Sequence, residues 1–159
     1  MLVGREHERA EVERALARAR SGESATLALI GEPGIGKSAL LDHAAARAGG
    51  MQLLRARAVE SEAQIPFASL FELLRPALGM LDGVPERQAV ALEGALALRP
   101  ARSQDRFAVG AATLSLLAAY AEQGAVAMLI DDAHLLDRAS AEALLFAVRR
   151  LVADPIAVL

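Results

Sequence analysis

Residues 31–38 read Gly31-Glu32-Pro33-Gly34-Ile35-Gly36-Lys37-Ser38, and this stretch decides the fold. It follows the apolar run 25–30 and leads into Ala39-Leu40-Leu41, a good start for a helix. A strand, a glycine-rich loop and a helix in this order form a P-loop, in which backbone N–H groups and the positive end of the helix surround a phosphate. The glycines leave room for the anion or permit positive φ angles. The pattern therefore predicts a phosphate-binding loop.

Two side chains at the end of this loop have separate roles. Lys37 reaches the β- and γ-phosphates as a flexible point charge, and the Ser38 hydroxyl binds Mg²⁺. Of 17 Lys and Arg residues, Lys37 is the single Lys, and a rigid guanidinium is not equivalent to an ammonium here. We expect ATP and Mg²⁺ as cofactors, with Lys37 also catalytic. The predicted cofactor-binding residues of the loop are Gly31, Glu32, Pro33, Gly34, Ile35, Gly36, Lys37, Ser38 and Ala39.

Composition limits the protein class. A chain of 159 residues suits one domain with a sizeable core. Aromatic residues make up only 3%, so that core must be packed from Ala, Leu and Val. The net charge of −3 argues against nucleic-acid binding by this segment alone, and the lack of cysteine excludes disulfides and thiolate sites. No secretory signal or membrane-spanning run is evident. We expect a cytoplasmic protein without membrane contact.

Hydrophobic patterning predicts an α/β chain. Largely continuous apolar segments are typical of parallel strands covered on both faces, and they occur at 24–30, 125–130 and 155–159. Residues 51–58 predict a further strand from alternation, with Leu54, Ala56 and Ala58 on one face and two arginines on the other. Helical patterns occupy 5–20, 37–48, 67–81, 86–98, about 103–123 and 138–153. Pro76 should break the third of these helices, and Ser103 and Ser140 are candidate N-caps. The alternation of strands and helices predicts a parallel sheet flanked by helices.

These elements predict a three-layer P-loop NTPase fold over residues 1–159, with a helical insertion at 59–124 between the second and third strands. The last apolar segment, 155–159, begins a fourth core strand where the sequence stops. Chain termini prefer the surface to a buried strand. We therefore expect the domain to be truncated within this strand, so that the sequence is a truncated piece, a fragment or the front part of a longer protein.

The apolar run 126–130 ends in Asp131 and Asp132, which fits a Walker B strand. The acids must sit at the carboxyl end of the strand, because the P-loop lies at the same edge of the sheet. Asp131 is then a metal ligand beside Ser38, and Asp132 is a candidate to orient or deprotonate the attacking water. A second acid at this position favours NTPases that carry an extra strand between the P-loop strand and the Walker B strand. Residues 155–159 would supply it.

Other polar residues leave alternatives open. The three histidines, His7, His43 and His134, show no ligand spacing, and His134 is of interest because it lies two residues past Asp132. Asp137 caps the following helix or orients a second-shell water. The basic cluster at Arg99, Arg102 and Arg106 is a solvated helix face or an arginine finger offered to a neighbouring subunit.

Three further stretches resemble a known family. The opening Leu2-Val3-Gly4-Arg5-Glu6 resembles the GRExE box that precedes the P-loop in signal-transduction ATPases with numerous domains (STAND proteins). Residues 65–76, IPFASLFELLRP, resemble a linker helix of large ATP-binding LuxR-type regulators related to MalT. Residues 131–140, DDAHLLDRAS, are similar to their Walker B region. The resemblance covers essentially the whole chain.

This resemblance implies an N-terminal ATPase followed by helical sensor repeats and a C-terminal helix-turn-helix. It places Gly4 and Arg5 near the adenine. It implies that ATP binding acts as a switch, which slow hydrolysis to ADP and phosphate resets, with possible ATP-dependent self-association. DNA would be contacted only through a C-terminal domain outside this sequence.

Two function classes follow. The first is the nucleotide switch of a LuxR-type transcriptional regulator. The second is a mechanochemical AAA+ enzyme that loads or remodels a DNA complex. A small-molecule phosphotransferase is a third, weaker alternative. The long gap in which Asp131 lies 94 positions after Lys37, together with the IPFASL stretch, favours the first.

Overall fold

The computed structural model describes residues 5–100 and 105–159, and within them one parallel sheet has the strand order β1-β4-β3-β2. The strands are β1 (Ala25–Thr26), β2 (Gln52–Arg57), β3 (Val126–Asp131) and β4 (Ile156–Val158). The helices are α1 (Glu6–Arg20), α2 (Lys37–Arg47), α3 (Ala68–Leu74), α4 (Glu86–Ala95), α5 (Arg106–Ala121) and α6 (Arg138–Val148). Shorter 3₁₀ segments are η1 (Glu60–Glu62), η2 (Arg75–Gly83) and η3 (Ala133–Leu135).

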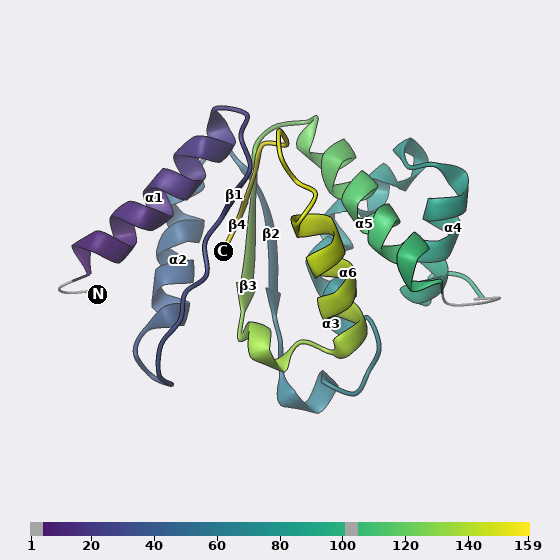
Figure 1. The fold of residues 1–159 in the computed structure, drawn as a ribbon, viewed down its shortest axis with the longest axis horizontal. Coiled ribbons are helices and arrows are strands. Elements are labelled where there is room, and N and C mark those ends of the chain that lie inside the picture. The colour runs from purple at the N-terminus through teal and green to yellow at the C-terminus, as the bar shows by residue number, and fades with distance from the viewer. Residues whose placement is uncertain (1–4, 101–104) are drawn as a thin grey trace.

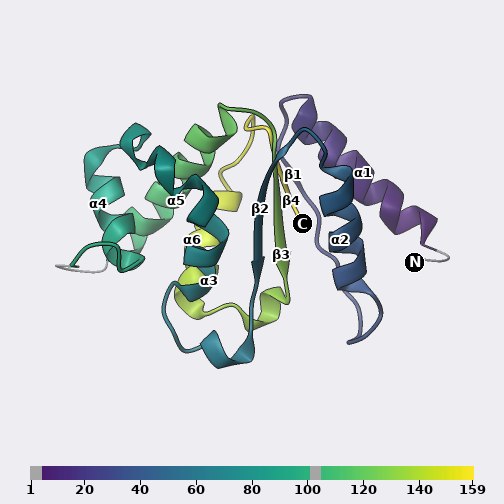
Figure 2. The same ribbon diagram turned by 180° about the vertical axis from the view of Figure 1, so that it is seen from behind.

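Helices cover both faces of the sheet, which confirms the predicted three-layer α/β fold. Helices α1 and α2 lie on one face, and α3, α5 and α6 lie on the other, with α4 packed outside α5 (Figures 1 and 2). Side chains of β3 alternate between the two layers. Val126 and Met128 join the core built with α3, α5 and α6, whereas Ala127 and Leu129 join the core built with α1 and α2. The central strand is thus buried on both faces, as its apolar sequence predicts.

Strand β4 lies between β1 and β3, and it pairs in parallel with both. Its position confirms the extra strand expected between the P-loop strand and the strand that ends in Asp131. Strand β2 completes the sheet, with Arg57 in register with Asp131. Because all the strands run the same way, the segments that follow β1, β2 and β3 meet at one edge of the sheet.

The first strand is shorter than predicted. Pairing ends at Thr26, apart from a bond from Leu27 N to the Val158 carbonyl at 2.8 Å, because the neighbouring strand β4 has only three residues. The prediction that this strand is covered on both faces is wrong for residues 26–30. Every second residue of this segment is exposed: Thr26, Ala28 and Ile30, with Ile30 94% exposed. They face a cavity rather than a packed helix.

Two predicted helix caps also need correction. Ser140 does not cap α6: Asp137 is the N-cap, and its carboxylate accepts a hydrogen bond from Ser140 N at 2.9 Å. Helix α5 is capped by Asp105, which accepts from Phe107 N and Ala108 N, while the predicted cap Ser103 lies outside the described residues. An Asp carboxylate has two acceptor oxygens for the free N–H groups of a first turn, so it competes well with Ser.

Proline explains the end of one helix, and a second helix is shorter than predicted. Helix α3 ends at Leu74 and the chain continues as the 3₁₀ segment η2, with Pro76 in its first turn, which confirms the predicted break. Helix α6 ends at Val148 rather than at residue 153. Pro155 follows this helix end by seven residues, and its carbonyl accepts from Val126 N at 2.8 Å as the chain turns into β4. No helix of the described residues is long and apolar enough to cross a membrane.

Candidate functional site

The loop between β1 and α2 has the backbone conformation that its glycines predict. Gly34 and Gly36 have φ values of +79° and +94°, and Gly36 is the N-cap of α2. Gly31 has a different role: a Cβ placed there would lie 2.9 Å from Cγ2 of Ile35 within the same loop. Each of these glycines therefore meets a physical requirement that a larger residue would violate. The loop exposes its backbone ahead of the helix N-terminus, as an anion site requires.

Lys37 occupies the first turn of α2 and folds back over the loop. Its Nζ donates to the carbonyl oxygens of Gly31 at 2.7 Å and Glu32 at 3.0 Å. These contacts hold the ammonium group at the mouth of the loop. Glu32 itself is exposed, so its carboxylate is free of the loop interior and leaves the positive charge of Lys37 available to an anion.

Ser38 and Asp131 meet across two elements. Ser38 Oγ, at the start of α2, donates to Asp131 Oδ1 at 3.1 Å, and the backbone N–H of Asp132 donates to the same oxygen at 3.0 Å. Asp131 is only 5% exposed. A hydroxyl and a carboxylate oxygen placed together are hard ligands of the kind that Mg²⁺ prefers. Among the described residues no group of three or more His, Cys, Asp or Glu side chains could hold a metal ion. A Mg²⁺ ion bound mainly through nucleotide phosphates fits this donor set.

Asp132 differs from its neighbour in both conformation and contacts. Its backbone is left-handed, with φ +53° and ψ +42°, an uncommon state for a residue with a side chain. Its Oδ2 lies 3.7 Å from Nε of Arg57, at the end of β2. The side chain is 29% exposed, so it reaches solvent while Asp131 stays inside. This carboxylate is therefore accessible to a water molecule.

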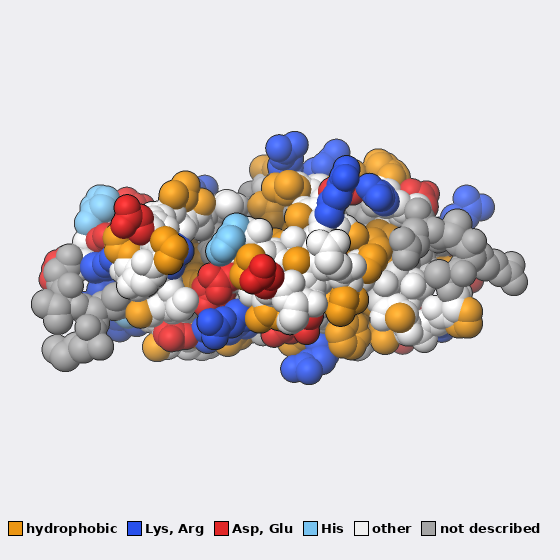
Figure 3. All heavy atoms as spheres, turned by 90° about the horizontal axis from the view of Figure 1, so that it is seen from below, with side chains coloured by type: hydrophobic (Ala, Val, Ile, Leu, Met, Phe, Trp, Pro, Cys, Tyr) orange, Lys and Arg blue, Asp and Glu red, His pale blue; other side chains and the backbone are white. Residues whose placement is uncertain are grey.

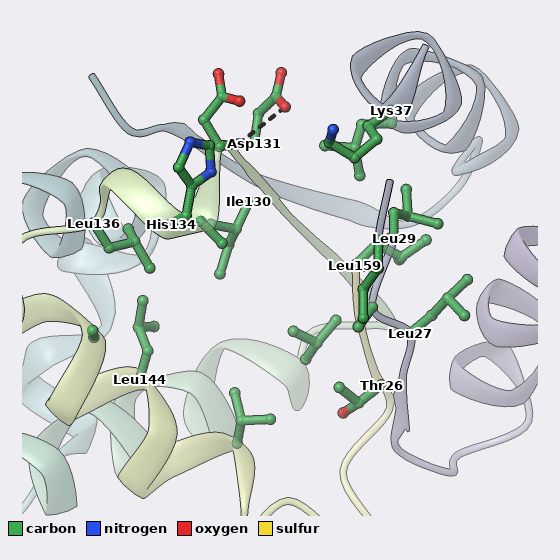
Figure 4. Close-up of a pocket in the computed structure, with 18 of the residues that line it drawn as sticks. Thr26, Leu27, Leu29, Lys37, Ile130, Asp131, His134, Leu136, Leu144 and Leu159 are labelled. Carbon is green, nitrogen blue, oxygen red and sulfur yellow. Dashed lines mark hydrogen bonds between the residues drawn. The ribbon is translucent and has the colours of Figure 1, made fainter. Parts of the chain in front are cut away.

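A cavity of about 730 Å³ opens beside these groups, between the segment that follows β1 and helix α6. In Figure 4, Lys37 lies on one side of the opening, with Asp131 and His134 on the other. The deeper wall is apolar and includes Leu27, Leu144 and Leu159 (Figure 4). Figure 3 views the molecule from this edge and shows acidic, basic and histidine side chains gathered next to hydrophobic ones. The polar groups thus lie at the rim of an apolar hollow.

The N-terminal residues reach the same loop. Arg5 donates through Nη2 to the carbonyl of Ile35, and both residues line a second cavity of about 230 Å³ with Lys37 and Leu40. This contact places Arg5 against the P-loop, and its predicted position near the adenine stays a prediction. Gly4 lies outside the described residues.

Asp137 is a buried carboxylate, 2% exposed, that binds two segments at once. Besides capping α6, it accepts from Phe67 N at 2.8 Å and Ser69 N at 3.2 Å, and Ser140 Oγ accepts from Leu70 N at 2.8 Å. Burial raises the pKa of this carboxyl, but the hydrogen bonds from Ser140, Phe67 and Ser69 outweigh it and hold the pKa below its ordinary value. Of the two roles left open by the sequence, the structure shows the cap.

The other predicted polar residues are placed as follows. His43 Nε2 lies 3.3 Å from Glu13, His7 lies 3.7 Å from Glu11, and His134 is exposed at the cavity rim. Arg99 and Arg106 pair with Glu93 and Glu142 of the same chain, and Arg102 lies outside the described residues. The arginine-finger hypothesis stays a prediction.

A scan of protein families matches the AAA ATPase domain over residues 1–159. The chain belongs to this family. Searches among curated proteins and among solved structures gave no match. Membership of the AAA ATPase domain family makes the chain a nucleotide-binding ATPase module, and it agrees with the parallel sheet and with the loop between β1 and α2. The roles assigned to individual side chains stay predictions.

Sequence reasoning missed two contacts of this AAA ATPase domain. One is the ion pair between Arg57 and Asp132, which follows once β2 is placed beside β3, because the register aligns Arg57 with Asp131. The other is the bond from Asp137 to the start of α3. No local signal reports that contact, since its partners lie about 70 residues earlier in the chain.

Proposed function

We propose that this chain is the ATP-binding, slowly hydrolysing nucleotide-switch module of a LuxR-type transcriptional regulator. The observation that carries the ATPase part is the convergence of Lys37, Ser38 and Asp131 from two elements at one edge of the sheet. The regulator part is supported by the resemblance of the opening residues and of the IPFASL stretch. It is also supported by the helices α3, α4 and α5, which occupy the chain between β2 and β3.

The residues would divide the work of phosphoryl transfer. Backbone N–H groups of residues 31–38 hold the phosphates, and the ammonium of Lys37 balances charge on the β- and γ-phosphates. Ser38 and Asp131 hold Mg²⁺, which when bound neutralises the charge that develops during transfer. Asp132 orients the attacking water or accepts its proton, from a position that solvent reaches. Arg5, which contacts Ile35, would lie beside the nucleoside.

The proposed setting is the cytoplasm, with ATP as the partner of this domain. Contact with DNA belongs to a C-terminal domain outside this sequence, and ATP promotes self-association of the switch. Slow hydrolysis suits such a protein, because the lifetime of the ATP state then sets the duration of the signal.

The test is a thermal unfolding experiment with Mg·ATP. At about 100 times its dissociation constant, ATP should add about 2.7 kcal/mol to the free energy of unfolding. For a domain of this size each kcal/mol raises Tm by roughly 2–4 °C, so a shift of several degrees is expected. Lys37→Ala should abolish the shift. Arg87→Ala removes one positive charge from the exposed surface of α4 and is the matched control, which should keep it. A folded protein whose Tm does not change when Mg·ATP is added would contradict the proposed function.

A further inference from the structure

The turn that carries Asp132 is fixed at both ends. On one side, β3 is paired in the sheet up to Asp131, which is itself buried. On the other side, the turn ends at Asp137, five residues after Asp132. The carboxylate of Asp137 accepts three backbone N–H bonds, from Phe67, Ser69 and Ser140. A buried carboxylate that accepts several N–H bonds is a strong anchor, because moving it would leave both the charge and the donors unpaired.

Between these ends the chain has little freedom. Leu135 N donates to the Asp132 carbonyl at 2.8 Å, and Leu136 N donates to the Ala133 carbonyl at 3.3 Å, closing the short segment η3. Asp132 itself has left-handed backbone. Residues in such sparsely populated conformations persist only where their surroundings determine them. The nearest fixed point on the downstream side is Asp137.

We propose that Asp137 is a positioning residue for Asp132. By fixing the downstream end of the turn, it keeps the Asp132 backbone left-handed and aims the carboxylate at the rim of the cavity, where it acts on water. This inference rests on the proposed ATPase function. It extends that function in one respect: because Asp137 also binds Phe67 and Ser69, the orientation of Asp132 is coupled to the start of α3.

The first test is Asp137→Asn, which keeps the shape of the side chain. The amide oxygen still accepts from backbone N–H groups, but the new NH₂ group faces one of the three donors, and the charge is lost. We expect kcat for ATP hydrolysis to fall at least about tenfold while the Kd for Mg·ATP stays within about twofold, since Asp137 does not line the cavity. The control is Asp105→Ala, which removes a helix cap with two N–H bonds at α5; Asp105, like Asp137, does not line the cavity.

The second test needs no nucleotide. Hydrogen exchange, followed by mass spectrometry, should be at least about tenfold faster in Asp137→Asn for the peptide that spans residues 131–136. Asp105→Ala should leave exchange in this peptide unchanged. If Asp137→Asn does not fold, Ser140→Ala provides a milder change, because it removes the acceptor of Leu70 N and the side-chain bond to Asp137.

The outcomes are distinct. Slower hydrolysis at unchanged ATP affinity, together with faster exchange only at 131–136, supports the positioning role. Equal losses of activity in the Asp137 and Asp105 variants, or unchanged exchange at 131–136, would overturn it. If the wild-type chain binds no ATP, the proposed function fails, and the exchange experiment still decides whether Asp137 fixes the turn.

Discussion

Asp131 and Asp132 are adjacent in the chain but touch different groups. Asp131 is buried and accepts from the Ser38 hydroxyl, whereas Asp132 is partly exposed and faces Arg57. A carboxylate fixed next to a hydroxyl from the P-loop helix suits metal binding, and one with access to solvent suits work on water. The two residues should therefore fail in different ways when their charge is removed.

Asp131→Asn should weaken Mg²⁺-dependent binding of ATP, because the amide is a poorer ligand for a hard cation. Asp132→Asn should leave ATP affinity nearly intact and slow hydrolysis by about 10²–10⁴-fold, the usual contribution of a general base. The measurements are equilibrium ATP binding and single-turnover hydrolysis on each variant. In a switch, the Asp132→Asn variant should stay in the ATP state and make a full-length regulator hyperactive. In a motor, the same variant should no longer load or remodel its DNA complex. Loss of binding in Asp132→Asn alone would mean that the roles are reversed.

At the scale of elements, sequence reasoning worked best where one local pattern decides the structure. The P-loop and strand β3 follow from glycine positions and a continuous apolar run, and both lie close to the predicted bounds. Sequence reasoning failed where a residue's partner lies far away in the sequence. The short pairing of β1 depends on the length of β4, and the exposure of residues 26–30 depends on which elements cover them. The cap at Asp137 is local and was one of two predicted roles, whereas its bonds to Phe67 and Ser69 join segments about 70 residues apart.

Asp137 accepts N–H bonds at the start of both α3 and α6, and this predicts how acid affects the packing of the two helices. The pKa of Asp137 is held below 3.8, the ordinary value for Asp. As the pH falls, the carboxyl of Asp137 therefore takes up a proton in the unfolded state before it does so in the folded state. The charged carboxylate stabilises the fold above pH 3.8, and this contribution is lost as the pH falls through the lower pKa of the folded state. We expect the difference in unfolding free energy between wild type and Asp137→Asn to shrink below that pH. Urea titrations from about pH 6 to about pH 3 measure it. A constant difference would show that the charge of Asp137 does not matter.

At the scale of the whole molecule, acidic residues outnumber basic ones, 20 to 17. The formal net charge is −3. Among the described residues, eight arginines form ion pairs with acidic side chains, for example Arg47 with Glu13, Arg55 with Asp42 and Arg138 with Glu142. DNA binding needs unpaired positive charge along one face, because its affinity comes largely from phosphate contacts and counterion release.

We therefore expect residues 1–159 to show no sequence-specific, salt-sensitive DNA binding, with or without Mg·ATP. Fluorescence anisotropy with a labelled duplex at about 50 mM and about 200 mM salt is a sharp test. A protein that makes 6–10 phosphate contacts loses about 10³–10⁵-fold in affinity over that range. Here the anisotropy should stay at the level of the free duplex at both salt concentrations, and Lys37→Ala should behave in the same way. Binding that appears only with ATP, and that disappears in Lys37→Ala, would place DNA contact in the nucleotide-bound ATPase domain. That result would favour a DNA-remodelling motor over a switch, because a switch of the proposed kind delivers its signal through a separate DNA-binding domain.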